Sequence, residues 1–317
     1  MNEEIIANSM VKAEAKRLGF DICGLAHAEP VDKHTSSFFD NWLNEKKNAD
    51  MDYLANYHDK RLDPRVLVEG TQTIISVALN YYPAQFIPPT EYQIAWYAYG
   101  KDYHEVVKQR LQKLLAELQT KYPWLTGRAF CDTAPVFERY WAWKAGLGWI
   151  GKNCMLIIPQ AGPCFFLGEL FINAKADEYD TPLPDRCGNC TRCLDSCPTG
   201  ALEAHHELNA SKCINYLTIE NKSGISPEIS PKIGNSIYGC NKCQAVCPWN
   251  KFAKPTGTPE LQPNASLLSM HKEDWNTLTE EQYRQVLRHS AMKRAKYSAL
   301  KRNIVAAKKN NDSEDSR

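Results

Sequence analysis

The amino-acid sequence predicts an α+β fold, in which a mixed α/β domain precedes a small cysteine-rich domain and a short basic helical region. Three observations support this prediction. Helical and strand-like apolar patterns are interspersed over the first 178 residues. Eight of the twelve cysteines lie between Cys187 and Cys247, and residues 284–309 carry nine Lys or Arg and no acidic residue. We expect domains at 1–178, 179–255 and 256–317, with a disordered polar tail at the end of the last.

Apolar spacing places three helices in the first domain. One is expected over 2–19, ending at Gly19, and the clearest over 102–122. Pro135 suits the first position of a helix, so a third is expected from there to Gly146. Runs rich in β-branched and aromatic residues predict strands at 20–26, 73–82, from 127, 154–159 and 164–174. The last two are expected to form a hairpin through Gly162-Pro163.

Composition limits the class of protein. A hydrophobic content of 43% and a charged content of 24% are ordinary for a globular chain. No run of about eighteen apolar residues is present, which excludes a membrane span. The N-terminal stretch has acidic residues early and no apolar core followed by a cleavage site, so it is no signal peptide. We therefore expect a cytoplasmic protein, and a monomer, since nothing resembles a self-association seam.

The cysteine spacing predicts two [4Fe–4S] clusters. The run from Cys187 to Pro198 has the complete C-x2-C-x2-C-x3-C-P pattern, whereas GCNKCQAVCP at 239–248 has one cysteine fewer. In two-cluster ferredoxins the fourth cysteine of each run binds the other cluster, and Cys213 is the one cysteine between the runs that fills the vacancy. Structural zinc is the alternative, but it prefers paired C-x2-C knuckles. The expected ligands are Cys187, Cys190, Cys193 and Cys247 for one cluster and Cys197, Cys213, Cys240 and Cys243 for the other.

Two clusters carry electrons, and a first domain of this size implies a reaction centre that consumes them. No G-x-G-x-x-G fingerprint follows a strand, and no Walker loop is present. The D-x-H-x-x-G pattern, by which some enzymes hold cobalamin through a histidine, is also missing. From the residues alone, the chain is a reductase fed by clusters whose reaction centre is open.

Several blocks resemble the epoxyqueuosine reductase family, in the same order along about residues 50–303. They are MDYLANYHDKRLDPR (51–65), IAWYAYGKDYHEV (94–106), CDTAPVFERYWAWKAGLGWIGKN (131–153), FFLGEL (165–170), CGNCTRCLDSCPTGAL (187–202), CINYLTIE (213–220), IYGCNKCQAVCPWN (237–250) and SAMKRAKYSALKRN (290–303). The resemblance implies a cobalamin-dependent reduction of the epoxide of epoxyqueuosine, at the tRNA wobble base, to queuosine. The clusters would feed a base-off cobalamin, whose strongly reduced cobalt attacks an epoxide carbon.

The epoxide oxygen must be protonated before it leaves as water, which needs a general acid. By resemblance this acid is Asp132 of CDTAP. Its place at the end of a strand, just before a helix, is where the active sites of open sheets gather. Taken alone, Asp132 is equally a helix cap for the segment that Pro135 opens.

The resemblance also implies further contacts. Two departures affect them: CINYLT stands where relatives usually have CISYLT, and GCN where they commonly have GCD. The cofactor-binding residues implied are Arg61, Ala95, Asp132, Leu156, Gly168, Asn215, Cys240 and Asn241. Substrate-binding candidates are Tyr103, His104 and Arg139, with His104 alternatively an ordinary surface histidine. The basic segment supplies candidates for tRNA phosphates, or else a solvated helix face: Lys293, Arg294, Lys296, Lys301 and Arg302.

Many relatives continue into helical repeats beyond this point, so the tRNA contact is expected to be smaller or concentrated in 284–309. Three other functions stay open. A reductive dehalogenase combines the same cofactors, but such enzymes generally carry an export signal and use a tyrosine acid. A non-catalytic electron carrier would hold two clusters without cobalamin. An RNA-binding protein with structural clusters would bind tRNA whatever their redox state. The electron donor stays unidentified.

Overall fold

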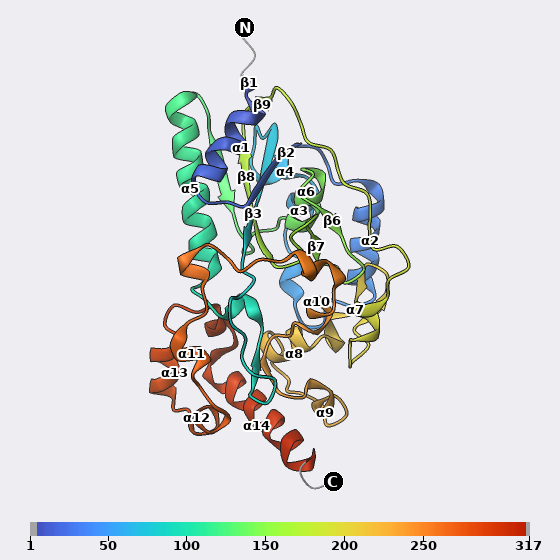
Figure 1. Ribbon diagram of the computed structural model, residues 1–317. Helices are drawn as coiled ribbons and strands as arrows, with labels where there is room; N and C mark the ends of the chain where they lie inside the picture. The colour runs from blue at the N-terminus through green and yellow to red at the C-terminus, as the bar shows by residue number, and fades with distance from the viewer. Residues whose placement is uncertain (1–4, 315–317) are drawn as a thin grey trace.

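A four-stranded antiparallel sheet forms the centre of the first domain (Figure 1). The computed structural model describes residues 5–314, and side chains up to residue 310. The two central strands are buried almost end to end, which explains their continuous apolar sequences. In spatial order the strands are β2 (Ile22–His27), β3 (Thr73–Asn80), β8 (Phe165–Ile172) and β5 (Gly127–Phe130).

Helices cover both faces of this sheet. On β3, Ile75 and Val77 pack in one apolar core with α1 (Asn8–Arg17) and α5 (Tyr103–Lys121). Ile74 and Ala78 point the other way, into a core with α6 (Glu138–Lys144). This alternation has the period of two that a strand imposes. The sheet therefore has α1 and α5 on one side and α6 on the other, as Figure 1 shows.

Shorter elements complete the first domain. β1 (Ile5–Ile6) pairs in parallel with β9 (Lys175–Ala176), and β6 (Trp149–Ile150) pairs antiparallel with β7 (Leu156–Ile157). Among the described helices none is long and apolar enough to cross a membrane. The remaining elements are α2 (Lys33–Asn44), the 3₁₀ turns η1 (Asp52–Leu54) and η2 (Trp96–Ala98), α3 (His58–Leu62), α4 (Pro64–Leu67) and β4 (Gln93–Ile94).

Two expectations for this domain are wrong. The expected hairpin through Gly162-Pro163 does not form, because β7 pairs with β6 while β8 enters the main sheet between β3 and β5. The third helix begins at Glu138 rather than at Pro135, since residues 131–137 form a non-helical loop. The rule that placed Asp132 at the edge of an open parallel sheet also does not apply, because this sheet is antiparallel.

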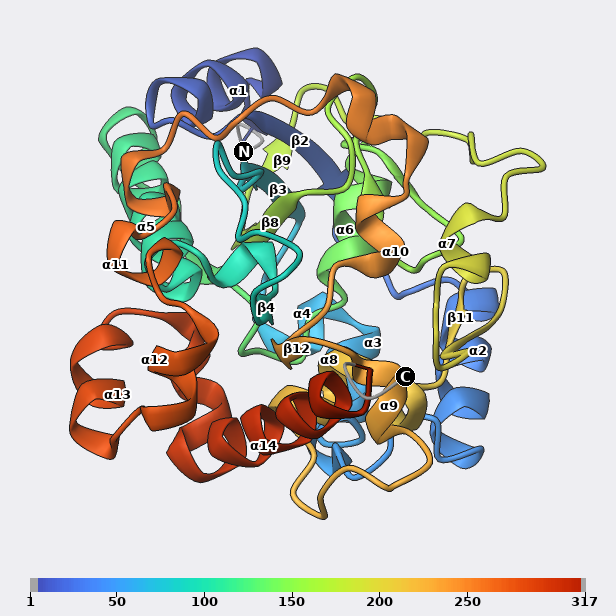
Figure 2. The same cartoon turned by 60° about the horizontal axis from the view of Figure 1, so that its bottom comes forward.

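The cysteine-rich domain consists of short elements. α7 (Arg192–Asp195) and α10 (Lys242–Ala245) each carry one cysteine of a cysteine run, and they lie next to each other (Figure 2). The adjoining apolar cluster joins Trp149 and Ile157 to Cys247, with Trp249 packed against it. The other elements are β10 (Leu202–Ala204), β11 (Glu207–Leu208), η3 (Ala210–Lys212), α8 (Ile214–Ile219), α9 (Ser230–Ile233), β12 (Ser236–Tyr238) and η4 (Pro248–Phe252).

The C-terminal region is helical and shares a core with the segment Ile87–Tyr99 of the first domain. Strand β4 of that segment pairs in parallel with β12, so three parts of the chain meet here. The last helix continues to Glu314, within the tail expected to be disordered, and residues 315–317 lie outside the described residues. The elements are η5 (Pro259–Leu261), α11 (Ala265–Leu268), α12 (Lys272–Thr277), α13 (Glu280–Val286), η6 (Ala291–Ala295) and α14 (Lys296–Glu314).

Candidate active site

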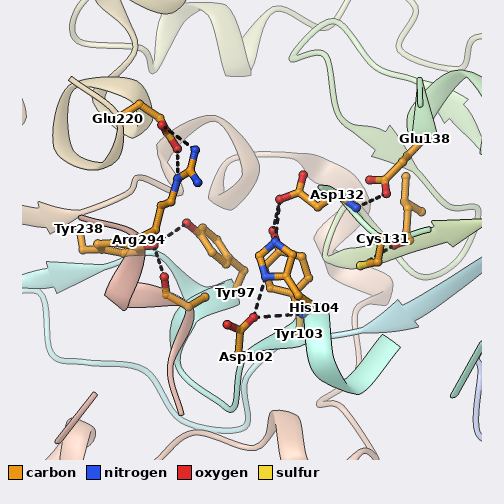
Figure 3. A network of polar contacts seen from close by, with 12 residues as sticks. Tyr97, Asp102, Tyr103, His104, Cys131, Asp132, Glu138, Glu220, Tyr238 and Arg294 are labelled. Carbon is orange, nitrogen blue, oxygen red and sulfur yellow. Dashed lines mark hydrogen bonds and ion pairs between the residues drawn. The ribbon is translucent and has the colours of Figure 1, made fainter. Parts of the chain in front are cut away.

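Asp132 lies in the loop between β5 and α6, and its carboxylate is held by two residues of α5 (Figure 3). Oδ2 accepts hydrogen bonds from the hydroxyl of Tyr103 at 2.7 Å and from Nε2 of His104 at 2.9 Å. The backbone of Asp132 has a φ of +57°, in the left-handed region that few non-glycine residues adopt. The side chain is nevertheless 54% exposed, so this carboxylate can meet a bound molecule.

His104 lies between two carboxylates. Its Nδ1 is 2.6 Å from Oδ1 of Asp102, which also caps α5 by accepting from the backbone N–H of His104. Burial alone would lower the pKa of His104, but the hydrogen bonds to Asp102 and Asp132 outweigh it and raise the pKa to about 9. The same contacts hold the pKa of Asp132 below its ordinary value although burial acts to raise it. At neutral pH the proton of this pair therefore resides on His104.

Tyr103 is fixed by stacking. Its ring lies 4.2 Å from the ring of Phe166 and 4.0 Å from that of His104, centroid to centroid. Burial, followed by the Asp132 carboxylate, raises the pKa of the phenol far above its ordinary value. Tyr103 therefore remains a hydrogen-bond donor to Asp132 across the range in which the protein is folded.

A second polar group faces Asp132 from the C-terminal side. Arg294 donates to both oxygens of Glu220, at 2.7 and 3.0 Å, and its guanidinium lies 5.9 Å from the ring centroid of Tyr53. Tyr53 is an exposed aromatic residue of η1, and the Asp132 carboxylate contributes to a raised pKa of its phenol. A further contribution from Asp132 raises the pKa of Tyr97. Tyrosine and arginine side chains thus border the exposed carboxylate.

The structure brings together the four cysteines expected for the first cluster, here called cluster site I. Burial, with contributions from the nearby thiols of Cys187, Cys193 and Cys190, raises the pKa of the Cys247 thiol to about 11. The indole Nε1 of Trp149 donates to Sγ of Cys187 at 3.5 Å. N–H donors around cysteine sulfurs are a common means of tuning iron–sulfur clusters.

The other four cysteines also meet, at cluster site II. Burial raises the pKa of Cys240 to about 11, with contributions from Cys213 and Cys197, and it raises that of Cys243 with contributions from Cys240, Cys213 and Cys197. Sγ of Cys197 accepts from the backbone N–H of Ala201 at 3.3 Å, and Sγ of Cys240 from that of Lys242 at 3.5 Å. Cys213, outside both runs, lies with this group.

This donor set fits cubane clusters. Across the described part of the chain, no three His, Cys, Asp or Glu side chains are placed to share one metal ion. A [4Fe–4S] cubane binds each of its cysteines at a different iron atom, whereas a structural zinc binds all four at one ion with Zn–S distances of about 2.3 Å.

Four of the expected cofactor contacts lie together beside cluster site II. Strand pairing joins the N–H of Ala95 to the carbonyl of Tyr238 at 2.8 Å. A Cβ added to Gly239, whose φ is +65°, would lie 2.5 Å from Cβ of Ala95 and 3.0 Å from Oδ1 of Asn215. Asn241 accepts from the N–H of Trp96 at 2.7 Å, so its amide is engaged within the protein. Cys240 follows Gly239 and brings its sulfur to the same place.

Among the expected cofactor contacts, Arg61 has a buried hydrogen-bond donor without a partner among the described residues. It is buried, and its guanidinium lies 5.8 and 5.6 Å from the ring centroids of Phe39 and Phe137. Its Nε has no hydrogen-bond partner among the described residues, and burial lowers its pKa. A buried cation with an unused donor suits a polar group of a bound cofactor.

Leu156 and Gly168 lie in apolar surroundings. Leu156 is buried in β7, in the core beside α6. A Cβ on Gly168 would lie 2.7 Å from Cγ1 of Val107 and 2.9 Å from Cδ1 of Leu111. The close approach of α5 to the sheet explains this glycine without a cofactor, and a cofactor role for Gly168 remains a prediction.

The basic residues divide into two groups. Lys293 and Lys296 are exposed, and Lys293 lies close enough to Asp102 to help lower the pKa of that carboxyl. Arg302 donates to the carbonyls of Leu217 and Asn221, at 3.1 and 2.8 Å, and Lys301 to that of Asn276 at 2.8 Å. Lys301 and Arg302 thus bind the protein itself. Arg139, the remaining candidate, is exposed and donates to the carbonyl of Cys154.

Sequence reasoning missed four residues around Asp132. Asp102 carried a visible signal, since an aspartate three residues before Glu105 at a helix start is a capping pattern. Glu169 carried another, as a charged residue within the apolar run FFLGELFI. Glu138, whose Oε1 accepts from the N–H of Asp132, and Tyr53 carried none beyond their family blocks.

Comparison with known proteins shows the family of this chain. Residues 61–133 match the family model "Epoxyqueuosine reductase QueG, DUF1730", and residues 186–250 match a "4Fe-4S double cluster binding domain". An epoxyqueuosine reductase of Cellulophaga algicola is 43% identical over 304 residues, 96% of this chain and 99% of the relative.

Two solved structures are similar over most of the chain. One is an epoxyqueuosine reductase with a tRNA-Tyr epoxyqueuosine-modified stem loop, with a TM-score of 0.86 and 30% identity, covering 95% of this chain and 80% of that one. The other is the Bacillus subtilis enzyme with its catalytic aspartate loop swung out of the active site. It has a TM-score of 0.86 and 28% identity, covering 95% of this chain and 81% of that one.

Proposed function

The chain belongs to the epoxyqueuosine reductase family, and from this premise we propose that the Asp132 site reduces the epoxide of epoxyqueuosine in tRNA to the alkene of queuosine. The observation that carries this function is the pairing of an exposed carboxylate with a protonated histidine, in a chain with a two-cluster [4Fe–4S] domain. Converting an epoxide to an alkene and water consumes two electrons and two protons. The clusters account for the electrons, and the Asp132–His104 pair for one proton and, after His104 takes up another proton from solvent, for the second.

The eight cysteines of cluster sites I and II are the ligands that we assign to the two clusters. The grouping of Cys213 with Cys197, Cys240 and Cys243 supports this assignment, because it supplies four thiols for each cluster. The adjacent helices α7 and α10 each carry one cysteine of a run, and their proximity favours electron transfer between the clusters.

The residues present fit a cobalamin between the clusters and Asp132. The unused Nε of buried Arg61 and the close-packed turn at Gly239, Ala95 and Asn215 are the contacts that we propose for it. When bound, cobalamin supplies a strongly reducing cobalt centre that accepts single electrons from the clusters. The protein's own contribution is to orient the substrate, exclude water and deliver protons.

The protons come through Asp132. In the structure Asp132 is a carboxylate that accepts from Nε2 of His104, and Asp102 on the other side of the ring stabilises the protonated imidazole. Transfer of the Nε2 proton to Oδ2 of Asp132 makes the carboxylic acid that protonates the leaving epoxide oxygen. Tyr103 holds the same oxygen in place by its hydrogen bond. His104 is then the proton source and Asp132 the group that meets the substrate.

The tRNA contacts that we propose are Lys293 and Lys296 for phosphates, with Tyr53 and Arg294 beside the modified base. Aromatic rings and guanidinium groups stack on bases that leave the anticodon stack. Because Lys293 is near Asp102, a phosphate bound there would lie close to the acid. Because the proposed substrate is a tRNA, we further propose that the enzyme acts in the cytoplasm. We also propose that it is a monomer and receives electrons from a separate donor protein.

The test is metal analysis followed by an activity assay. The protein is purified without oxygen, incubated with cobalamin, freed of excess ligand and assayed with epoxyqueuosine-containing tRNA. About eight iron atoms and one cobalt per chain, together with queuosine formation, are expected. Iron without cobalt would indicate the electron carrier, and cobalt with turnover of aryl halides but not of epoxyqueuosine the dehalogenase.

A further inference from the structure

A buried carboxyl group lies beneath the Asp132 loop without a hydrogen-bond partner. Glu169 is in the middle of β8 and has no exposed surface. Neither of its carboxyl oxygens has a partner among the described residues, and the same holds for the buried hydroxyl of Ser76, its register partner on β3. A carboxylate ion in such surroundings is strongly disfavoured, so Glu169 carries a proton.

Glu138 joins this group to the Asp132 loop. It is the first residue of α6, it is half-buried, and Oε1 accepts the backbone N–H of Asp132 (Figure 3). Helix α6 packs on β8, and burial followed by the Glu138 charge raises the pKa of Glu169 well above the ordinary value. Burial and then the Asp132 carboxylate raise the pKa of Glu138 itself to about 8.

The Asp132 backbone needs such a contact. With a φ of +57° it is in a left-handed conformation that costs an aspartate free energy. The neighbouring turn is tight, since the N–H of Thr133 donates to the carbonyl of Cys131 at 2.6 Å. The bond to Glu138 holds the N–H of Asp132 while Tyr103 and His104 hold its carboxylate. The residue is thus fixed at both ends.

We propose that Glu138 is a positioning residue that latches the Asp132 loop in its catalytic position, and that the buried, protonated Glu169 favours the uncharged form of this latch. This inference rests on the proposed function, because it takes Asp132 as the acid. It adds two carboxyl groups, those of Glu138 and Glu169, that touch neither substrate nor cofactor and act through Asp132.

The charge of the latch matters because of what faces it. Asp132 and Glu169 oppose an ionised Glu138, whereas Arg139 and His104 favour it, and the thiol of Cys131 is near Asp132, Glu138 and Glu169. Neighbouring carboxyl groups in a low dielectric do not both ionise easily. Loss of the Glu138 proton at alkaline pH would place a new negative charge next to the Asp132 carboxylate, and repulsion between the two charges would oppose the position that the latch holds.

The experiment compares three variants of the loaded enzyme with epoxyqueuosine tRNA. Glu138→Leu removes the acceptor, so kcat should fall by about tenfold to a hundredfold with KM nearly unchanged. Glu138→Gln keeps an uncharged acceptor and should restore most of kcat at neutral pH. The activity of wild type is expected to fall as pH rises through about 8, and that of Glu138→Gln is not. Glu169→Gln should shift that loss to lower pH or remove it. Glu281→Gln, an exposed glutamate of α13, is the matched control.

A second readout needs neither cobalamin nor turnover. Infrared difference spectra recorded across a pH titration should show the C=O band of a protonated carboxyl group disappearing at alkaline pH in wild type, and altered in Glu138→Gln and Glu169→Gln. Equal, large losses in Glu138→Gln and Glu138→Leu, or full activity in both, would overturn the proposal, as would an unchanged band in both glutamine variants. If wild type does not reduce epoxyqueuosine, the proposed function fails, and the infrared titration still tests the carboxyl pair.

Discussion

At the scale of single residues, the acid that we propose is a pair rather than one carboxyl group. Asp132 alone, with a pKa below its ordinary value, would be a poor proton donor at neutral pH. His104 compensates, because its raised pKa keeps a proton 2.9 Å from the Asp132 oxygen. In such a coupled pair the macroscopic titration belongs to both groups. The function of Asp102 follows: its charge stabilises the imidazolium that holds the proton.

Asp132→Asn should abolish epoxide reduction while both clusters and cobalamin are retained. The amide cannot pass a proton to the leaving oxygen, and general acids of this kind contribute about a hundredfold to ten-thousandfold. Single-turnover queuosine formation, with iron and cobalt content, measures both effects. The matched control is Asp59→Asn, since the side chain of Asp59 is 94% exposed and remote in function. Full activity of Asp132→Asn would remove Asp132 as the acid.

The pH dependence of stability should follow His104. Its folded pKa of about 9 exceeds the ordinary value of 6.5, so its contribution is complete below about pH 6.5 and is lost as pH rises through about 9. The thermal unfolding midpoint of the wild-type protein should therefore decrease as pH rises from about 6.5 to about 9. The fall should be smaller in His104→Gln, which has no charge to lose. An identical pH profile in both proteins would contradict the raised pKa of His104.

At the scale of elements, Cys213 tests the ligand assignment. It lies just before α8, outside both cysteine runs, yet it neighbours Cys197, Cys240 and Cys243. Cys213→Ser should damage one cluster and leave the other, giving between four and eight iron atoms per chain and a changed EPR signal on reduction. Cys23→Ser, at a half-buried cysteine of β2, should behave as wild type. An unchanged signal in Cys213→Ser would refute the assignment.

The sequence predicted the four strands of the central sheet and α1, α5 and α6, but not the strand pairing, and α2, α3 and α4 were not predicted. β2, β3, β8 and α5 begin and end within a few residues of the expected positions. The hairpin prediction failed because strand propensity does not specify a partner, and β8 finds two better ones in the long buried sheet. Helix α6 begins late because residues 131–137 form a loop, in which the N–H of Val136 donates to the carbonyl of Ala134 at 2.8 Å, a tighter turn than a helix makes.

For the site, sequence alone identified the residues with distinctive chemistry. The cysteines have a spacing that few other structures need, and Asp132 stands in a specific block. Glu138 and Glu169 were missed because the role that we propose for them depends on the packing of α6 on β8, which the local sequence does not reveal. Arg302 was assigned to tRNA because a charge run does not reveal which side chains turn inward to bind carbonyl groups.

At the scale of the whole molecule, the C-terminal region is tied to both other parts. Asn303 is fully buried and donates to the carbonyls of Thr218 and Ile237, at 2.7 and 2.9 Å, which joins α14 to α8 and β12. The N–H of Asp102 donates to the carbonyl of His289, so the start of α5 is held by the same region. The residues that we propose for substrate binding and for proton delivery are therefore held by one connected framework.

This framework predicts different consequences for two kinds of basic residue. Replacing Lys293 and Lys296 together by alanine should weaken tRNA binding and reduce its salt dependence, by about 0.7 to 0.9 in slope for each phosphate that is no longer neutralised. Folding should be unaffected, because both side chains are exposed.

Arg302→Ala should do the reverse: it leaves the carbonyls of Leu217 and Asn221 without their donor and lowers the free energy of unfolding by about 1–3 kcal/mol. Binding titrations at several salt concentrations, with urea unfolding of each variant, separate the two effects. A salt slope that falls only in Arg302→Ala would show that the tRNA approaches α14 from the other side, and would require a different path from the anticodon to Asp132.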